Sequence, residues 1–353
     1  PEVHTMEFQL RQNGRAAIAF LADLAVASSR LRPKIDAELL AKGLNQQTLA
    51  DDLDERLLQV DAALVGSPSA RAVAILSEFS GVNHGRVGQA AFDEILPELE
   101  PKLRELQTRG PTTLEARLGD RLPEYQKRCW IHRTTGGWDG HPYQGFVHGE
   151  LVHREYVAKN YPGDIFAQRR EVLSLLPRQD YRRIMEFGTS SGHYTMQLAK
   201  VFPQAEIWGC DLSLRMLEQA QRVANEHGWA WRLFQLAAED TGFEAASFDL
   251  VTSYIVLHEI PTETTHAQMR EAFRLLRPGG DLLFTDITQY SALDKAAQRW
   301  AEYGAVHGGE PFWREAATLD LAAAARDAGF VNVRSEGFRG AKYPWVTYGH
   351  KPE

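Results

Sequence analysis

The chain has 353 residues, of which 44% are hydrophobic and 24% charged, and its formal net charge is −8. This length suits about two domains, and the apolar content excludes an intrinsically disordered chain. A negative charge without any basic block argues against nucleic acid as a partner. No apolar run is long enough to span a bilayer and no charged-then-apolar leader opens the sequence, so we expect no membrane partner and a cytoplasmic location.

Residues 1–118 are expected to form a helical bundle domain. Apolar residues recur at three- and four-residue spacing from about Met6 onward, which is typical of amphipathic helices. Ser67-Pro68 has the character of a helix start, and the pattern breaks near Gly43. The region shows no strand pattern and no catalytic motif. We expect it to support a second domain, to form a homodimer interface, or to dock a carrier or partner protein.

Residues 119–165 form a connecting segment that is rich in aromatic and histidine residues. We expect this segment to act as a lid that covers a substrate site with polar and aromatic contacts. The stretch from His148 to His153 suggests a metal motif. However, side chains five residues apart diverge by about 140° on an α-helix of 3.6 residues per turn. We therefore expect no bound metal.

Residues 166–353 alternate between strand and helix patterns, which predicts a parallel α/β sheet. Buried strands are expected at residues 184–187, 206–210, 231–236, 248–256 and 281–287. Helices are expected at residues 193–202, 214–227, 262–276 and 319–328. The final strands, at residues 331–338 and 345–350, are joined by a turn-like link, which favours an antiparallel pair.

The region from residue 182 to 211 carries the main functional motif. A strand containing Glu186 is followed by the turn Gly188-Thr189-Ser190-Ser191-Gly192, a helix, and a second strand that ends in Asp211. Glycine lets a backbone approach a ligand closely, and a strand-end carboxylate can accept hydrogen bonds from both ribose hydroxyls. This unit predicts a nucleoside site. Ser190 replaces the middle glycine of a dinucleotide loop and Glu186 would repel a phosphate, which disfavours NAD.

The pattern acid-x-Gly-x-x-x-Gly, followed by a strand-end acid, resembles motif I of the class I S-adenosylmethionine-dependent methyltransferases. That motif usually has a third glycine, which Ser190 replaces here. The resemblance covers about residues 165–353 and includes the acids Glu239-Asp240, the FDLV strand, the L-R-P-G-G turn and the A-G-F before the last strand pair. It implies an α/β, Rossmann-like sheet of seven strands, with strand seven antiparallel between strands five and six, beside the all-α N-terminal domain.

The resemblance also implies S-adenosyl-L-methionine as the cofactor and assigns residues to it by position. Those around its methionine and ribose parts would be Glu186, Gly188, Thr189, Ser190 and Gly192. Asp211 would hold the ribose hydroxyls. Those around the adenine would be Leu212, Met216, Ala238, Glu239 and Asp240. Tyr254, near the end of the fourth strand, would lie close to the sulfonium.

Methyl transfer from a sulfonium is an in-line displacement, so the protein mainly positions the acceptor and excludes water. A neutral acceptor must lose a proton, and ligands bind beyond the carboxyl ends of parallel strands. His258 and Glu259 follow the fourth strand directly, which makes His258 the best candidate for the base, with Glu259 to orient it. A histidine that only caps the next helix is the alternative. Further acceptor contacts are expected from Tyr143, His148, Tyr161, Trp300, His307 and Trp313.

Together, these residues predict a biosynthetic enzyme that methylates an oxygen or nitrogen atom of a small metabolite or natural product. Other interpretations keep the fold but change the reaction, or attach the acceptor to a carrier protein. An NAD-dependent oxidoreductase and a non-catalytic interaction protein built on the helical domain also stay open.

Overall fold

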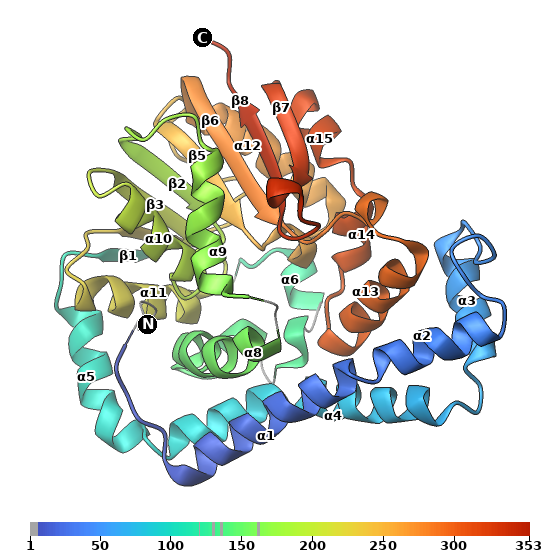
Figure 1. Ribbon diagram of the computed structural model, residues 1–353. Helices are drawn as coiled ribbons and strands as arrows, with labels where there is room; N and C mark the ends of the chain where they lie inside the picture. The colour runs from blue at the N-terminus through green and yellow to red at the C-terminus, as the bar shows by residue number, and fades with distance from the viewer. Residues whose placement is uncertain (1–5, 120, 129–130, 135–136, 161–162) are drawn as a thin grey trace.

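A computed structural model describes residues 6–119, 121–128, 131–134, 137–160 and 163–353. Its strands form one sheet flanked by helices, and the long N-terminal helices lie across the side of the molecule opposite the C-terminus (Figure 1). No helix in this described part combines the length and the apolar character that a bilayer span requires.

The N-terminal region is mainly helical, as expected. Its helices are α1 (Gln12–Ser29), α2 (Arg32–Ala41), α3 (Leu53–Ala63), α4 (Pro68–Asp93) and α5 (Leu96–Thr108). Helix α4 begins where the sequence predicts, because the Ser67 hydroxyl accepts a hydrogen bond from the backbone N–H of Ala70 and Pro68 occupies the first turn. The break near Gly43 is also confirmed, since α2 ends two residues before it.

The expectation that the N-terminal region contains no strand is wrong. Residues Thr113–Ala116 form strand β1, which pairs in parallel with β4 (Arg232–Gln235) at the edge of the sheet. Thr112 anchors this strand, because its backbone N–H donates to Asn225 and its hydroxyl donates to the carbonyl of Trp229. Four residues are too few to show a strand periodicity, so this conformation depends on pairing with β4.

The other strands follow the predicted seven-stranded order. They are β2 (Arg183–Phe187), β3 (Glu206–Asp211), β5 (Phe248–Tyr254), β6 (Leu276–Asp286), β7 (Val331–Gly337) and β8 (Trp345–His350). The order across the sheet is β1-β4-β3-β2-β5-β6-β8-β7. Strand β8 is antiparallel to both of its neighbours, whereas β1 to β6 pair in parallel. The fold is therefore α/β and Rossmann-like, with β1 as an added eighth strand.

Helices cover both faces of the sheet. Helices α10 (His193–Val201) and α11 (Leu214–Glu226) contribute to the buried cluster on one face, and α12 (Thr262–Leu275) and α15 (Leu321–Asp327) to the cluster on the other. Successive strand residues alternate between the two clusters. Because both faces are covered, every residue of β5 is buried, including the polar residues Asp249, Thr252 and Ser253, and the strand shows no alternation of buried and exposed positions.

The connecting segment folds into short helical elements that lie between the N-terminal helices and the sheet (Figure 1). They are α6 (Glu124–Arg128), η1 (Ile131–Arg133), η2 (Gly137–Asp139), α7 (Gln144–Phe146), η3 (Val147–Val157) and α8 (Ala158–Asn160). Helix α9 (Ile165–Glu171) begins at the last residue of the segment, and η4 (Val172–Leu175) follows it and packs on the sheet. Leu151 and Val152 of η3 are buried in one cluster with Ile18 of α1 and Phe92 of α4. The segment is thus part of the helical core.

The region between β6 and β7 packs against the N-terminal helices. This region contains η6 (Tyr290–Ala292), α13 (Lys295–Gly308) and α14 (Trp313–Thr318). Two further short helices lie outside it: η5 (Leu257–Glu259) follows β5, and η7 (Phe338–Gly340) lies between β7 and β8. Trp300 of α13 is buried with Ile35 of α2 and Val60 of α3. This contact ties the N-terminal helices to the sheet through α13.

Candidate functional site

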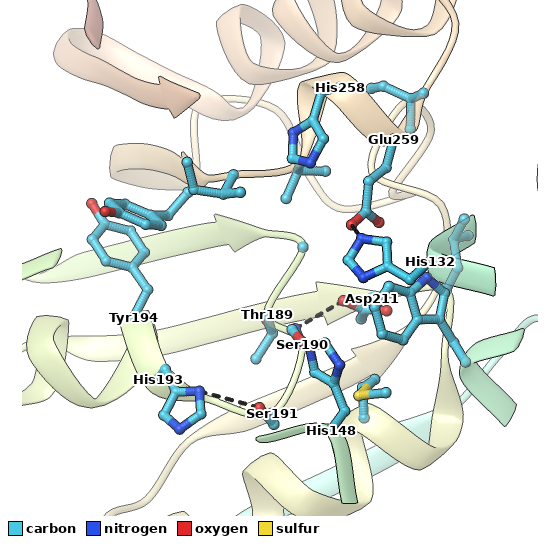
Figure 2. A pocket seen from close by; sticks show the side chains of 18 of the residues that line it. His132, His148, Thr189, Ser190, Ser191, His193, Tyr194, Asp211, His258 and Glu259 are labelled. Atoms are coloured by element: carbon cyan, nitrogen blue, oxygen red, sulfur yellow. Dashed lines mark hydrogen bonds and ion pairs between the residues drawn. The ribbon is translucent and has the colours of Figure 1, made fainter. Parts of the chain in front are cut away.

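The turn after β2 is bonded directly to the end of β3. Gly188 has a φ of 76°, and a Cβ on it would lie 2.3 Å from Val256 Cγ2, so only glycine fits without movement. Ser190 has a φ of 48°, and its backbone N–H donates to Asp211 Oδ2 at 2.8 Å, as Figure 2 shows. The turn and the strand-end acid therefore form one hydrogen-bonded unit.

Asp211 lines a cavity at the carboxyl ends of the strands. Its Oδ1 accepts a hydrogen bond from the backbone N–H of Ser213 at 2.9 Å. Burial raises the pKa of Asp211 to about 7, although its two backbone donors act in the opposite direction. Each carboxylate oxygen has two lone pairs, so both oxygens can still accept a hydrogen bond from a ligand hydroxyl.

Glu186 is a buried carboxyl group on the same cavity. Its Oε2 accepts a hydrogen bond from the Thr195 hydroxyl at 2.6 Å, while its Oε1 has no hydrogen-bond partner among the described residues. Burial raises the pKa of Glu186 to about 8. The group is therefore mostly protonated at neutral pH, and a cationic ligand group would favour its carboxylate form.

The same cavity continues in two directions from this unit. Towards β4 its wall contains Leu212, Met216, Ala238 and Glu239. The Tyr125 hydroxyl of α6 donates to Glu239 Oε1 at 2.9 Å, which brings the connecting segment over this part. In the other direction the wall continues along the residues that follow β5.

The exit of β5 is tightly constrained. The ring of Tyr254, its last residue, packs against the ring of Tyr194 in a tilted arrangement, with centroids 5.0 Å apart. The next residue, Ile255, has a φ of 60°, which is rare for a β-branched side chain, and its N–H donates to the carbonyl of Thr285 at 2.7 Å. Such strain often occurs where a backbone positions functional groups.

His258 is held by Asp286 at the end of β6. Its Nδ1 lies 2.9 Å from Asp286 Oδ1, and Asp286 Oδ2 accepts hydrogen bonds from the N–H groups of Val256 and Leu257. Burial lowers the pKa of His258, but Asp286 outweighs burial and raises it to about 9. Burial raises the pKa of Asp286, yet His258 and the backbone donors bring it below its ordinary value. His258 is therefore mainly protonated in the free protein, and it could act as the predicted base only after losing that proton.

Three further polar side chains lie beside His258. His132 Nε2 is 3.2 Å from Glu259 Oε1 and 3.1 Å from Glu310 Oε1. One ligand atom from each of His132, His258, Glu259 and Glu310 lies within 4.8 Å of all the others. Figure 2 shows His132 and Glu259 side by side below His258. Two imidazoles and two carboxylates are a set that can hold a divalent metal ion.

Comparison with known proteins identifies the sheet domain. Residues 184–280 match the family model described as a methyltransferase domain. Malonyl-[acyl-carrier protein] O-methyltransferase of Legionella pneumophila is 32% identical over 127 residues, which are 35% of this chain and 42% of that protein. Residues 184–280 belong to a class I S-adenosylmethionine-dependent methyltransferase domain.

Another curated relative and one solved structure also match this chain in part. Trans-aconitate 2-methyltransferase of Deinococcus radiodurans is 28% identical and matches 44% of this chain and 62% of its own length. Phosphoethanolamine N-methyltransferase 2 of Haemonchus contortus, solved with S-adenosyl-L-methionine, gives a TM-score of 0.48 at 18% identity and covers 66% of this chain and 61% of its own. The chain thus spans less than two thirds of each of these relatives.

The cavity of the methyltransferase domain fits S-adenosylmethionine, the cofactor of this family. Glu186 Oε1, Thr189 Oγ1 and Glu239 Oε2 are buried oxygen atoms that make no hydrogen bond within the described structure, and all three residues line the cavity. The cofactor carries an ammonium group, ribose hydroxyls and an adenine amino group, which are donors that such oxygen atoms need.

Most of the predicted cofactor residues meet at this cavity of the methyltransferase domain. Those that line it are Glu186, Gly188, Thr189, Ser190, Asp211, Leu212, Met216, Ala238 and Glu239. Gly192 and Asp240 do not line it. Gly192 instead packs closely against Ala220, and Asp240 is exposed. The predicted catalytic residues Tyr254, His258 and Glu259 line the same cavity, as do His148 and Trp313.

Three of the predicted acceptor residues lie elsewhere, because they serve helix packing. The Tyr143 hydroxyl donates to Glu100, and Trp300 Nε1 donates to Asp36. His307 Nδ1 lies 3.2 Å from Glu78 on α4. The sequence could not separate these roles, because an aromatic or histidine side chain serves a pocket and a helix interface equally well. Tyr161 lies outside the described residues.

The sequence argument that His148 and His153 diverge is wrong in the structure. Both lie on η3, which is a π-helix rather than an α-helix. Its backbone hydrogen bonds join residues five apart, so the two rings share one face, with centroids 5.8 Å apart. Burial lowers the pKa of each well below its ordinary value, so both are neutral in the cavity wall.

Sequence reasoning missed His132 and Glu310. His132 lies in the predicted histidine-rich segment, but no motif singled it out. Glu310 follows Gly308-Gly309, a recognisable helix stop with no link to a cofactor motif. The link is tertiary, because the His132 backbone N–H donates to the carbonyl of Gly309 at 2.9 Å. Such a contact between distant segments leaves no local pattern.

Proposed function

We propose that this protein transfers a methyl group from S-adenosylmethionine to an oxygen or nitrogen atom of a small molecule. One observation carries this proposal. The cofactor-type groups Glu186 and Asp211 share a single cavity with the polar residues His258 and Glu259 that follow β5. A donor and an acceptor bound at these two parts would occupy one cavity, which favours direct transfer between them.

We further propose residue roles at the cofactor end. S-adenosylmethionine supplies a methyl group that is activated by a positively charged sulfur. Asp211 would accept hydrogen bonds from the ribose hydroxyls, because its oxygens retain free lone pairs. Glu186 would pair with the ammonium group through Oε1, which lacks a partner among the described residues. Glu239 would accept a hydrogen bond from the adenine amino group through Oε2.

At the other end, His258, Glu259 and Trp313 would surround the acceptor. The bond from Asp286 fixes the His258 ring, so that Nε2 is directed towards Glu310, 3.9 Å away. An oxygen or nitrogen nucleophile gives up a proton as it is methylated, and a positioned acidic or basic side chain assists this step. We propose that the side chains of His258 and Glu259 both bind the acceptor. His258 already carries a proton in the free protein, so Glu259 would receive the proton of the acceptor.

The cofactor assignment can be tested with a pair of matched variants. Asp211→Ala should weaken S-adenosylhomocysteine binding by more than about tenfold, because the two ribose hydroxyls lose their hydrogen bonds to the carboxylate. Asp240→Ala removes an exposed aspartate outside the cavity and should leave the affinity unchanged. Isothermal titration calorimetry measures both. Equal affinities for the two variants would refute the ribose contact.

A carrier-tethered acceptor is the second candidate, because one relative is named malonyl-[acyl-carrier protein] O-methyltransferase. A tethered acceptor would require methyl transfer to occur only when a compound is linked to a carrier protein. Mass spectrometry of the free compound and of its carrier-linked form, each incubated with S-adenosylmethionine, separates the two cases. Methylation of the free compound favours the small-molecule proposal.

A further inference from the structure

Three segments that are distant in the sequence place four potential metal ligands at one point. His132 lies on η1, His258 and Glu259 lie on η5, and Glu310 follows α13. Their ligand atoms lie within 4.8 Å of one another. Four ligand atoms at about 2.1 Å from one ion are separated by about 3 to 4 Å, so the observed cluster is only slightly wider than a metal-bound one.

The hydrogen bond to His258 is of the kind found around bound metals. Its Nδ1 lies 2.9 Å from Asp286 Oδ1, which in turn is fixed by the N–H of Ile287. A carboxylate bonded to one ring nitrogen of a histidine sets the tautomer and leaves the other nitrogen free to coordinate an ion. Here that other nitrogen is Nε2, which faces the remaining three residues of the cluster.

Some polar atoms of the cluster lack a hydrogen-bond partner among the described residues. His132 Nε2 and Glu310 Oε2 are buried, and neither makes a hydrogen bond of acceptable geometry within the described structure. The two carboxylates approach the same nitrogen, yet a single N–H can point at only one of them. Among the described residues, no lysine or arginine forms an ion pair with Glu259 or Glu310. A divalent cation would neutralise both carboxylates and use the nitrogen lone pair.

The backbone is shaped to bring the ligands together. His132 has a φ of 56°, an uncommon conformation for a residue other than glycine. Gly309 has a φ of 76°, and a Cβ on it would lie 2.5 Å from Arg133 Cγ. The backbone hydrogen bond from His132 to Gly309 joins the two segments beside this point. Strained residues held in place by neighbouring structure are common at functional sites.

We propose that His132, His258, Glu259 and Glu310 bind one divalent transition-metal ion at the acceptor end of the cavity. Two imidazoles and two carboxylates suit manganese, iron or zinc better than magnesium or calcium, which prefer oxygen ligands alone. Manganese and iron commonly take six ligands, so either ion, held by four protein ligands, can keep an open position for an oxygen atom of the acceptor. This last role rests on the proposed methyl transfer, whereas binding of the ion does not.

The competing arrangement is an ion-pair network without metal, in which a protonated His132 lies between two carboxylates. Two substitutions separate the alternatives. Glu310→Gln keeps the size of the side chain and removes its charge. His132→Asn removes the imidazole and retains a residue that tolerates positive φ. The matched controls are Glu315→Gln, which changes an exposed carboxylate, and His307→Asn, which changes a histidine outside the cavity.

The experiment uses the full chain after treatment with a chelator and dialysis, with circular dichroism to check folding. Calorimetric titration with Mn²⁺, and separately with Zn²⁺, should show one equivalent bound by the wild-type chain. Glu310→Gln and His132→Asn should each weaken that binding by about tenfold or more, and the two controls should match the wild type. The melting temperature of the wild-type chain should rise with added ion.

Two results would overturn the proposal. One is a wild-type chain that takes up neither ion at millimolar concentration, and the other is uptake that is equal in all four variants, which would mean surface binding. Titration of the same metal-free sample with S-adenosylhomocysteine keeps this question separate from the proposed function. Cofactor binding without metal uptake refutes only the metal site, and metal uptake without cofactor binding refutes only the proposed function.

Discussion

At the scale of single residues, Glu186 is a buried acid whose charge depends on its ligand. Its surroundings raise its pKa to about 8, and burial is the largest cause. The ammonium group of a bound cofactor would favour the carboxylate, so binding at neutral pH should release a proton. Free protein and complex would then differ in the charge of this one side chain.

We predict that Glu186→Gln flattens the pH dependence of stability. Between about pH 4.5 and 8 the folded wild type keeps a proton on Glu186 that the unfolded chain has released. The free energy of unfolding should therefore fall as pH rises through this window, by about 1.4 kcal/mol per pH unit from this group alone. Urea unfolding at several pH values measures the slope. An unchanged slope in the variant would show that Glu186 does not titrate there.

Ser190 is the residue at which the turn departs from the family motif, and its φ of 48° is one that glycine adopts freely. We predict that Ser190→Gly raises the free energy of unfolding by about 1 kcal/mol, because the left-handed conformation costs about that much for a residue with a Cβ. Chemical denaturation checks this value. A loss of stability would mean that the serine side chain makes a compensating contact.

At the scale of elements, the contact between η3 and the cofactor turn depends on Gly149. A Cβ at this position would lie 2.8 Å from Ser191 Cβ. We predict that Gly149→Ala lowers the free energy of unfolding by about 1–3 kcal/mol and weakens S-adenosylhomocysteine binding, because the helix and the turn must separate.

The control for this prediction is Gly304→Ala, since a Cβ on Gly304 in α13 meets no atom within 4 Å. This substitution should raise the free energy of unfolding by up to about 1 kcal/mol, because alanine has the higher helix propensity, and should leave S-adenosylhomocysteine binding unchanged. Thermal unfolding and calorimetry compare the two variants. Equal stability of the two would contradict a tight contact between η3 and the turn.

The sequence predicts elements well where burial is continuous and poorly where a distant partner decides the conformation. Strand β5 is recognisable because both of its faces are covered, and α4 because Ser67 and Pro68 mark its start. Strand β1 depends on pairing with β4, and the π-helical form of η3 depends on its packing among α1 and α4. The local sequence therefore predicts neither of these two conformations.

At the scale of the whole molecule, the site also has a part that the local sequence predicts and a part that depends on contacts between distant segments. The cofactor residues could be predicted because Glu186 to Asp211 form one contiguous unit of fixed spacing. The cluster of His132, His258, Glu259 and Glu310 could be predicted only in part, because His132 and Glu310 come from two segments that are distant from His258 and Glu259 in the sequence. We propose that the connecting segment at 119–165 acts as a lid, since Tyr125 reaches Glu239 from α6.

We also propose that the N-terminal helices pair two copies of the chain. Phe20 of α1 and Ile75 of α4 are large apolar side chains that are 58% and 69% exposed. Ile75→Glu should then convert a dimer into a monomer without changing cofactor affinity, as measured by analytical ultracentrifugation and calorimetry. A wild-type chain that sediments as a monomer at all concentrations would exclude this interface.

The central claim is that the cavity beside Glu186 and Asp211 binds S-adenosylmethionine. Calorimetric titration of the purified chain with S-adenosylhomocysteine, and separately with NAD, tests it most directly. We predict binding of S-adenosylhomocysteine in the micromolar range, with a proton released at neutral pH, and no binding of NAD. Binding of NAD without S-adenosylhomocysteine would contradict the interpretation of the cavity and of the turn that forms it.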